Sequence, residues 1–182
     1  LVCVVNYKNE QEVLDYARNL SNQTALSEIH LLVTNNASSS SVNLDLEQEL
    51  STLPISACYY EPGKNLGYLT GALYGYRQYM VSAKKEPLWV VVSNTDIEIK
   101  DSDFFLKMIT NDYSEDIWCL APSVYSASKK TYDNPQYTER ISLSKLNRLI
   151  WIHERPLLAF LYAKLSKMKA KFTRKKKMGS RY

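Results

Sequence analysis

The segment 88–100 reads Leu-Trp-Val-Val-Val-Ser-Asn-Thr-Asp-Ile-Glu-Ile-Lys, and it decides the predicted fold. Its first five residues are apolar, which is typical of a strand that is buried on both faces of a parallel sheet. Four polar residues follow at once, from Ser93 to Asp96. Ligands of open α/β sheets bind outside the carboxyl ends of the strands, so this cluster predicts a binding site. The alternative is a plain exit from strand to loop, because Asn, Thr and Asp are frequent turn residues.

Strands and helices alternate along most of the chain. Apolar runs predict strands over 1–7, 28–34, 55–61, 88–92 and 117–122. Helical spacing predicts helices over 10–21 and 66–83, a short helix near 44–53, and one after Asp101 or Ser102. Such alternation indicates parallel crossovers and an α/β/α sandwich with a mostly parallel central sheet, followed by C-terminal helices. We place the domain boundary near Ile141, with an α/β domain over 1–141 and a helical segment over 142–182.

Two smaller features accompany these elements. Asn9 and Glu12 have the spacing of a capping box at the start of the first helix. The three cysteines, Cys3, Cys58 and Cys119, each lie in an apolar run, so we expect them to be buried within strands. Their odd number and spacing indicate neither a disulfide framework nor a metal site. A reducing, cytoplasmic compartment is therefore expected.

Charge is distributed unevenly along the chain. The 182 residues carry a formal charge of +4, yet the segment 164–182 holds nine Lys or Arg and no acid, which leaves −5 on the rest. After Pro156, apolar residues recur at helical spacing: Leu158, Leu161, Leu165, Met168 and Phe172. This pattern predicts a basic amphipathic helix over 156–178 that binds a membrane surface peripherally, on its cytoplasmic face. The alternative is that the apolar stripe packs on protein.

The predicted strands bring polar residues to one edge of the sheet. Asn6 and Tyr7 end the first strand, Asn35 and Asn36 follow the second, and Asn94 and Asp96 follow the fourth. A tyrosine ring can stack on a base, and amides can pair with the edge of that base. We expect Asp96 to hold a divalent cation, which neutralises a diphosphate.

A further polar cluster, Lys64, Asn65 and Gly67, opens the helix after the third strand. Free N–H groups at a helix N-terminus favour phosphate, Lys64 adds positive charge, and Gly67 permits close approach to the backbone. Together with the strand-end residues, this cluster supplies the parts of a site for a nucleoside diphosphate.

These residues resemble four successive signatures of family 2 glycosyltransferases, in particular the rhamnosyltransferase-like branch. The matching motifs are Val-Val-Asn-Tyr at 4–7, Val-Thr-Asn-Asn-Ala-Ser at 33–38, Asn-Leu-Gly-Tyr at 65–68 and Val-Ser-Asn-Thr-Asp at 92–96. The resemblance covers about residues 1–140. It implies a GT-A fold related to the Rossmann fold, a sugar donor linked to UDP or TDP, and Mg²⁺ or Mn²⁺ held by Asp96. It also implies a glycan or lipid-linked acceptor, as in polysaccharide biosynthesis, and no nucleic-acid partner.

The chain departs from the family pattern at several positions. Asn35 stands where the family usually has a base-contacting Asp, Lys8 replaces a frequent Asn, and Ala72 and Leu73 replace paired asparagines. The acidic catalytic base of the family's second half has no counterpart after Arg140. We therefore expect a donor-binding part that is inactive alone, with its catalytic residues unassigned.

Two other interpretations remain open at this point. One is a non-catalytic, truncated nucleotide-binding or interaction module. The other is a nucleotidyltransferase with a related sheet, although the glycine-rich basic loop that such an enzyme needs after its first strand is missing from 6–12. A dinucleotide-dependent oxidoreductase is disfavoured, because no G-x-G-x-x-G motif follows any predicted strand.

Overall fold

The computed structural model describes residues 1–36, 45–83, 85–132 and 141–166. They divide into two compact units, Leu1–Ser114 and Glu115–Tyr182, so the division falls earlier than the boundary expected near Ile141. Met168 and Phe172 of the predicted amphipathic stripe lie outside the described residues, as do Ala37 and Ser38 of the second motif.

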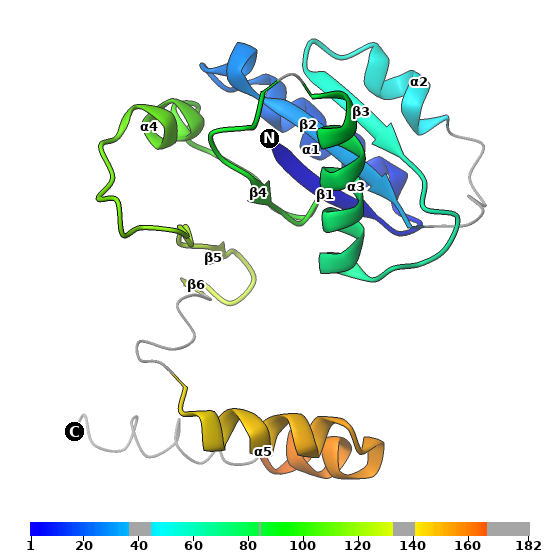
Figure 1. The fold of residues 1–182 in the computed structure, drawn as a ribbon, viewed down its shortest axis with the longest axis vertical. Helices are drawn as coiled ribbons and strands as arrows, with labels where there is room; N and C mark the ends of the chain where they lie inside the picture. The colour runs from blue at the N-terminus through cyan, green and yellow to red at the C-terminus, as the bar shows by residue number, and fades with distance from the viewer. Residues whose placement is uncertain (37–44, 84, 133–140, 167–182) are drawn as a thin grey trace. The chain divides into compact units, whose positions relative to one another are not determined.

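A four-stranded sheet forms the centre of the first unit (Figure 1). Its strands are β1 (Val2–Asn6), β2 (His30–Asn35), β3 (Ser56–Tyr60) and β4 (Val91–Val92). They lie in the order β3-β2-β1-β4, and every pairing is parallel. The α/β class with a parallel sheet is thereby confirmed. All four strands deliver their carboxyl ends to the same edge, because parallel strands point the same way.

Helices cover both faces of this sheet. Successive side chains of a strand point to opposite faces, so β1 contributes Val2 and Val4 to one core and Cys3 to the other. The first core also includes residues of α1 (Glu10–Ser21), α2 (Leu46–Ser51) and α4 (Phe104–Thr110). The second core includes Ala72 of α3 (Tyr68–Ser82), the helix that crosses in front of the strands in Figure 1. A short 3-10 helix, η1 (Leu26–Glu28), follows α1.

Glycine lets α3 approach the sheet closely. A Cβ atom on Gly75 would overlap the side chains of Leu32 and Thr34, both on β2. One turn earlier, a Cβ on Gly71 would lie 2.9 Å from the Asn36 amide nitrogen. The backbone of α3 therefore occupies space that any larger residue at these two positions would need.

The segment 88–92 differs from its prediction. Only Val91 and Val92 pair, and they pair with β1 alone. Among the described ranges no strand lies on the outer side of β4, so β4 is an edge strand. Exposure alternates along 88–92, with Leu88 78% exposed while Val91 packs against the first core. The expected burial on both faces is wrong for this strand, because α3 covers the central strands.

The prediction of a strand over 117–122 is also wrong. This segment joins no sheet in the described residues, and Trp118 is 91% exposed. Cys119 is consequently exposed, whereas Cys3 is buried and Cys58 is partly buried. Two short antiparallel strands follow instead, β5 (Tyr125–Ser126) and β6 (Thr131–Tyr132).

The C-terminal part is helical, as predicted. It contains α5 (Leu143–His153) and a second helix over 156–166, whose first residue is Pro156. Proline suits a first helical position, because the N–H that it lacks would have no partner there. Among the described residues, every helix is too short or too polar to cross a bilayer.

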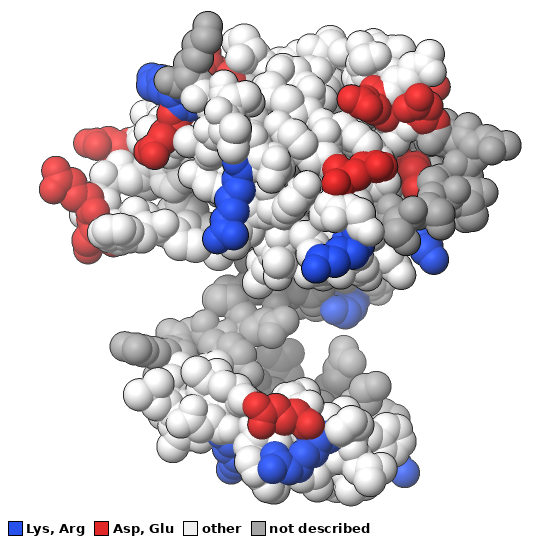
Figure 2. All heavy atoms as spheres, turned by 45° about the vertical axis from the view of Figure 1, so that its right-hand side comes forward, with Lys and Arg blue, Asp and Glu red and all other residues white. Residues whose placement is uncertain are grey.

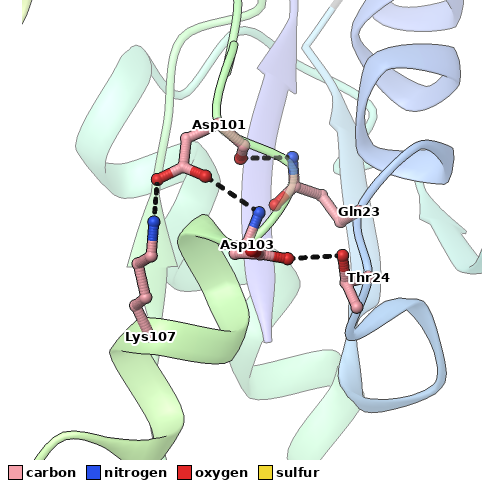
Figure 3. A network of polar contacts seen from close by, with 5 residues as sticks. All are labelled: Gln23, Thr24, Asp101, Asp103 and Lys107. Atoms are coloured by element: carbon pink, nitrogen blue, oxygen red, sulfur yellow. Dashed lines mark hydrogen bonds and ion pairs between the residues drawn. The ribbon is translucent and has the colours of Figure 1, made fainter.

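A network of polar contacts fixes the segment between β4 and α4 against the end of α1 (Figure 3). Gln23 donates to the Asp101 carbonyl at 3.1 Å, and the Thr24 hydroxyl donates to Asp103 at 2.7 Å. Asp101 accepts hydrogen bonds from Lys107 and from the backbone N–H of Asp103. The N-cap position of α4 is Asp103, rather than Asp101 or Ser102; its side chain makes no capping hydrogen bond, and Asp101 stabilises the turn by accepting from the Asp103 N–H.

Candidate functional site

Asn6 organises the carboxyl edge of the sheet. It pairs in register with Asn35, its side chain is buried, and its amide donates to Asn35 Oδ1 at 3.0 Å and to Glu10 at 3.3 Å. Its Oδ1 accepts from the Asn9 N–H at 3.0 Å. The expected capping box is therefore not formed: Asn9 makes no side-chain cap, and Asn6 satisfies the backbone at the start of α1.

Asn35 is held inside a network at the ends of β2 and β3. Its amide donates to the Tyr59 hydroxyl at 2.7 Å and to Glu61 Oε1 at 3.1 Å, while Tyr59 donates to the same Glu61 oxygen at 2.6 Å. Burial, followed by the hydrogen bond to Glu61, raises the pKa of Tyr59 well above its usual value. Both amide hydrogens of Asn35 are thus used within the protein. The carboxylate of Glu61, an exposed residue, is the outermost group of this network.

Asn36 joins the sheet to α3. Its side chain is almost fully buried, donates to the Gly67 carbonyl at 2.8 Å and accepts from the Leu66 N–H at 3.5 Å. Gly67 has φ 74° and ψ −178°, a conformation that is essentially restricted to glycine. Asn65 accepts from the Gly67 N–H at 2.8 Å. Gly67 is required here by its backbone conformation, and Asn36 holds the start of α3 at the end of β2.

The start of α3 lies close to the end of β4. Burial raises the pKa of the Tyr68 phenol, and the nearby carboxylate of Asp96 raises it further. Asp96 and Asn94 are exposed. The Thr95 hydroxyl between them donates to Glu12 of α1 at 3.4 Å, which brings a second carboxylate to this edge. Asn19 bonds the backbone of Ile99 in both directions, at 2.9 and 3.2 Å, and so secures the segment after Asp96.

Tyr7 is exposed at the end of β1. Its ring is 54% exposed, and Lys8 Nζ lies 5.5 Å from the ring centre. Lys8 has φ 61°, in the left-handed region that Asn tolerates better than Lys. Lys64 is exposed and precedes α3. Tyr7 and Lys64 are therefore accessible to a ligand.

The donor set at this edge restricts how a divalent cation is held. Among the described residues, no three His, Cys, Asp or Glu side chains converge into a ready-made metal site. An exposed carboxylate such as Asp96 instead fits the mode in which one or two carboxylates hold Mg²⁺ and substrate phosphates complete its ligands. The side chains at this edge fit the expected cation in that mode.

A hollow of about 470 Å³ lies between α2 and β3. Its lining includes Glu47, Leu50, Tyr59 and Tyr60. It shares Tyr59 with the Asn35 network, but none of the predicted site residues lines it. We assign it no role in the candidate site.

The sequence did not assign three residues of this edge to the site: Glu12, which was expected only in a capping box, Tyr59 and Glu61. Glu61 directly follows β3, so its place at a strand end was the available signal. Glu12 lies on α1, and only the tertiary fold brings it to Thr95. Comparison of the chain with protein-family models, with curated proteins and with solved structures found no match.

Proposed function

We propose that the carboxyl edge of this sheet binds the nucleoside diphosphate of a sugar donor, and that the chain is the donor-binding part of a glycosyltransferase. One observation carries the proposal: the helix start that Asn36 and Gly67 position lies at the same edge of the parallel sheet as Asp96, which follows β4. A carboxylate beside free helix N–H groups suits a diphosphate whose charge is shared between a cation and a helix N-terminus.

Each exposed side chain then has a distinct role. Tyr7 stacks on the base, and Lys64 and the first N–H groups of α3 hold phosphate oxygens. Asn6, Asn35 and Asn36 position these groups from within, since their own hydrogen bonds are made inside the protein. Asn65 and Gly67 shape the turn that precedes α3. Asn94 and Asp96 border the diphosphate from the segment that follows β4.

Asp96 is the residue that would hold Mg²⁺ or Mn²⁺, which neutralises charge on the leaving diphosphate when it is bound. In the complete reaction, an acceptor hydroxyl attacks the anomeric carbon and the bond from that carbon to the diphosphate oxygen breaks. The hydroxyl proton passes to a carboxylate base that none of the residues assigned here supplies. The acceptor, a glycan or a lipid-linked sugar, belongs to this proposal.

A non-catalytic nucleotide-binding module is the second candidate. It is favoured by the internal use of both Asn35 amide hydrogens, which leaves Glu61 as the outward polar group beside the base position. Such a module would bind a nucleotide and transfer nothing. Turnover of a nucleotide sugar by the chain would exclude such a module, whereas a donor-binding part that is inactive alone and a module would both bind without turnover.

A thermal-shift series tests the proposal. UDP, TDP and GDP are compared with and without Mn²⁺ on the same preparation. A ligand at a hundredfold excess over its dissociation constant stabilises the folded state by about 2.7 kcal/mol. At about 2–4 °C per kcal/mol, we expect the melting temperature to rise by several degrees with Mn²⁺ present. If none of the nucleotides shifts the transition under any condition, the proposal fails.

A further inference from the structure

The C-terminal helices, 143–153 and 156–166, expose large apolar side chains. The chain changes direction between them at Glu154 and Arg155, and the rings of His153 and Tyr162 approach to 6.3 Å across this bend. Residues nine apart in one continuous helix would be separated by about 13.5 Å along its axis. The side chains of Leu149, Ile152 and Leu158 are partly buried, whereas most other side chains of the two helices are exposed.

Part of the exposed surface of both helices is apolar. Exposed side chains recur at helical spacing in two sets: Leu143, Leu146 and Ile150 with Trp151 on α5, and Leu157, Phe160, Leu161 and Leu165 on the second helix. Leu157 is 81% exposed and Phe160 67%. Isolated exposed apolar residues are ordinary, but sets along one helix indicate a surface that binds something.

Basic residues accompany these apolar faces. The segment 143–166 carries Lys145, Arg148, Arg155 and Lys164 against a single acid, Glu154. Figure 2 shows basic side chains among broad uncharged areas of this unit. Arg155 lies 4.2 Å from the Trp151 ring and donates to its carbonyl at 2.8 Å, so this guanidinium stays beside an exposed aromatic ring. The sequence adds eight more Lys or Arg and no acid after Lys164.

We propose that the helices 143–166 bind the surface of an anionic bilayer. Leu157, Phe160 and their apolar neighbours enter the headgroup boundary, and the flanking Lys and Arg contact lipid phosphates. Charge complementarity selects this partner: residues 143–182 hold twelve Lys or Arg and one acid, whereas residues 1–142 hold 11 basic and 18 acidic side chains, a charge of −7 that the same surface would repel. Helices too short or too polar to span a bilayer fit an interfacial position.

Co-sedimentation of the full chain with vesicles tests this proposal. We expect binding to vesicles of phosphatidylcholine with phosphatidylglycerol, little binding to phosphatidylcholine alone, and a marked loss at high salt. Leu157→Ser with Phe160→Ser should lower the partition coefficient roughly tenfold or more, because two apolar side chains no longer enter the interface. Val81→Ser, at another exposed apolar side chain, is the matched control and should bind like the parent chain.

A charge variant gives an independent readout if the serine variant loses helicity by circular dichroism. Arg148→Glu with Lys164→Glu should weaken binding to anionic vesicles, while Lys85→Glu in the first unit should not. Equal binding to both kinds of vesicle, or to neither, overturns the proposal. Binding that survives the serine substitutions but is lost at high salt overturns it as well, since charge alone would explain it. A parent chain that self-associates through these residues and ignores vesicles assigns the surface to a second copy instead.

Discussion

Replacing Asn35 by Asp tests how the strand ends are organised. The Asn35 amide nitrogen lies 3.1 Å from Glu61 Oε1 and 2.7 Å from the Tyr59 hydroxyl. Asn35→Asp puts a second carboxylate in a position that is 5% exposed, facing the Glu61 carboxylate, and the Tyr59 hydroxyl has a single proton to donate to the pair. Two unit charges 3.1 Å apart repel by about 5 kcal/mol at an effective dielectric constant of 20.

Protonation limits this penalty. Keeping one carboxyl of the pair neutral costs about 1.4 kcal/mol per pH unit above its ordinary pKa near 4, or about 4 kcal/mol at pH 7. This is less than the repulsion, so the folded variant takes up one proton, shared by the pair. We expect Asn35→Asp to lose about 3–4 kcal/mol of unfolding free energy at pH 7. The pKa of the carboxyl pair is raised in the folded variant. The loss of unfolding free energy is therefore small below about pH 4 and grows as the pH rises toward that folded pKa.

Urea unfolding of Asn35→Asp and the parent chain at pH 4.5, 6 and 7.5 measures this difference. Glu61→Gln in the same chain should restore most of the stability, because a glutamine amide donates where the carboxylate repelled. Asn94→Asp adds a charge at an exposed position of the same edge and should change stability by less than about 0.5 kcal/mol. A loss that is the same at all three pH values, or that Glu61→Gln fails to restore, would refute the reasoning.

Three further substitutions test the packing. Gly75→Ala should destabilise the first unit by about 1–3 kcal/mol, because its Cβ overlaps Leu32 and Thr34; unfolding midpoints check this, and an unchanged midpoint would mean that α3 does not lie so close. Thr34→Val should raise the unfolding free energy by about 1 kcal/mol, since Thr34 Oγ1 is buried with no hydrogen-bond partner among the described residues; a loss would reveal a partner. Lys8→Gly should raise it by up to about 1 kcal/mol, because φ 61° suits glycine; a lowered melting temperature would show that Lys8 makes contacts worth more than this strain.

The sequence predicted the parallel sheet because its signals were local: apolar runs, helical spacing and polar strand ends. It predicted too much burial for 88–92, because a valine run does not reveal whether a strand is central or at an edge, and exposure here alternates from residue to residue. The apolar run at 117–122 likewise found no strand to pair with in the part of the chain that the structure describes. Hydrophobic periodicity is a property of a single segment, whereas strand pairing also requires a neighbouring strand.

The positions of the candidate site residues at strand ends could be predicted from the sequence, but their hydrogen-bond partners could not. The sequence located Asn35 and Asn36 correctly at a strand end, yet their amides proved to be buried and engaged with Glu61 and Gly67. Contacts of this kind join residues about 25 to 30 positions apart, so no local pattern encodes them. The need for glycine at 71 and 75 could not be predicted for the same reason, because it depends on how closely α3 approaches the sheet.

Calorimetric titration of UDP into the chain, with and without Mn²⁺, tests the central claim most directly. We predict saturable binding that requires Mn²⁺ and is lost in Asp96→Ala, a variant whose melting temperature stays within about 1 °C of the parent because an exposed carboxylate contributes little to stability. Glu49→Ala, which removes an exposed carboxylate from α2, should bind like the parent chain. Unchanged UDP affinity in Asp96→Ala, or binding that is indifferent to Mn²⁺, would contradict the assignment of this edge as a donor site.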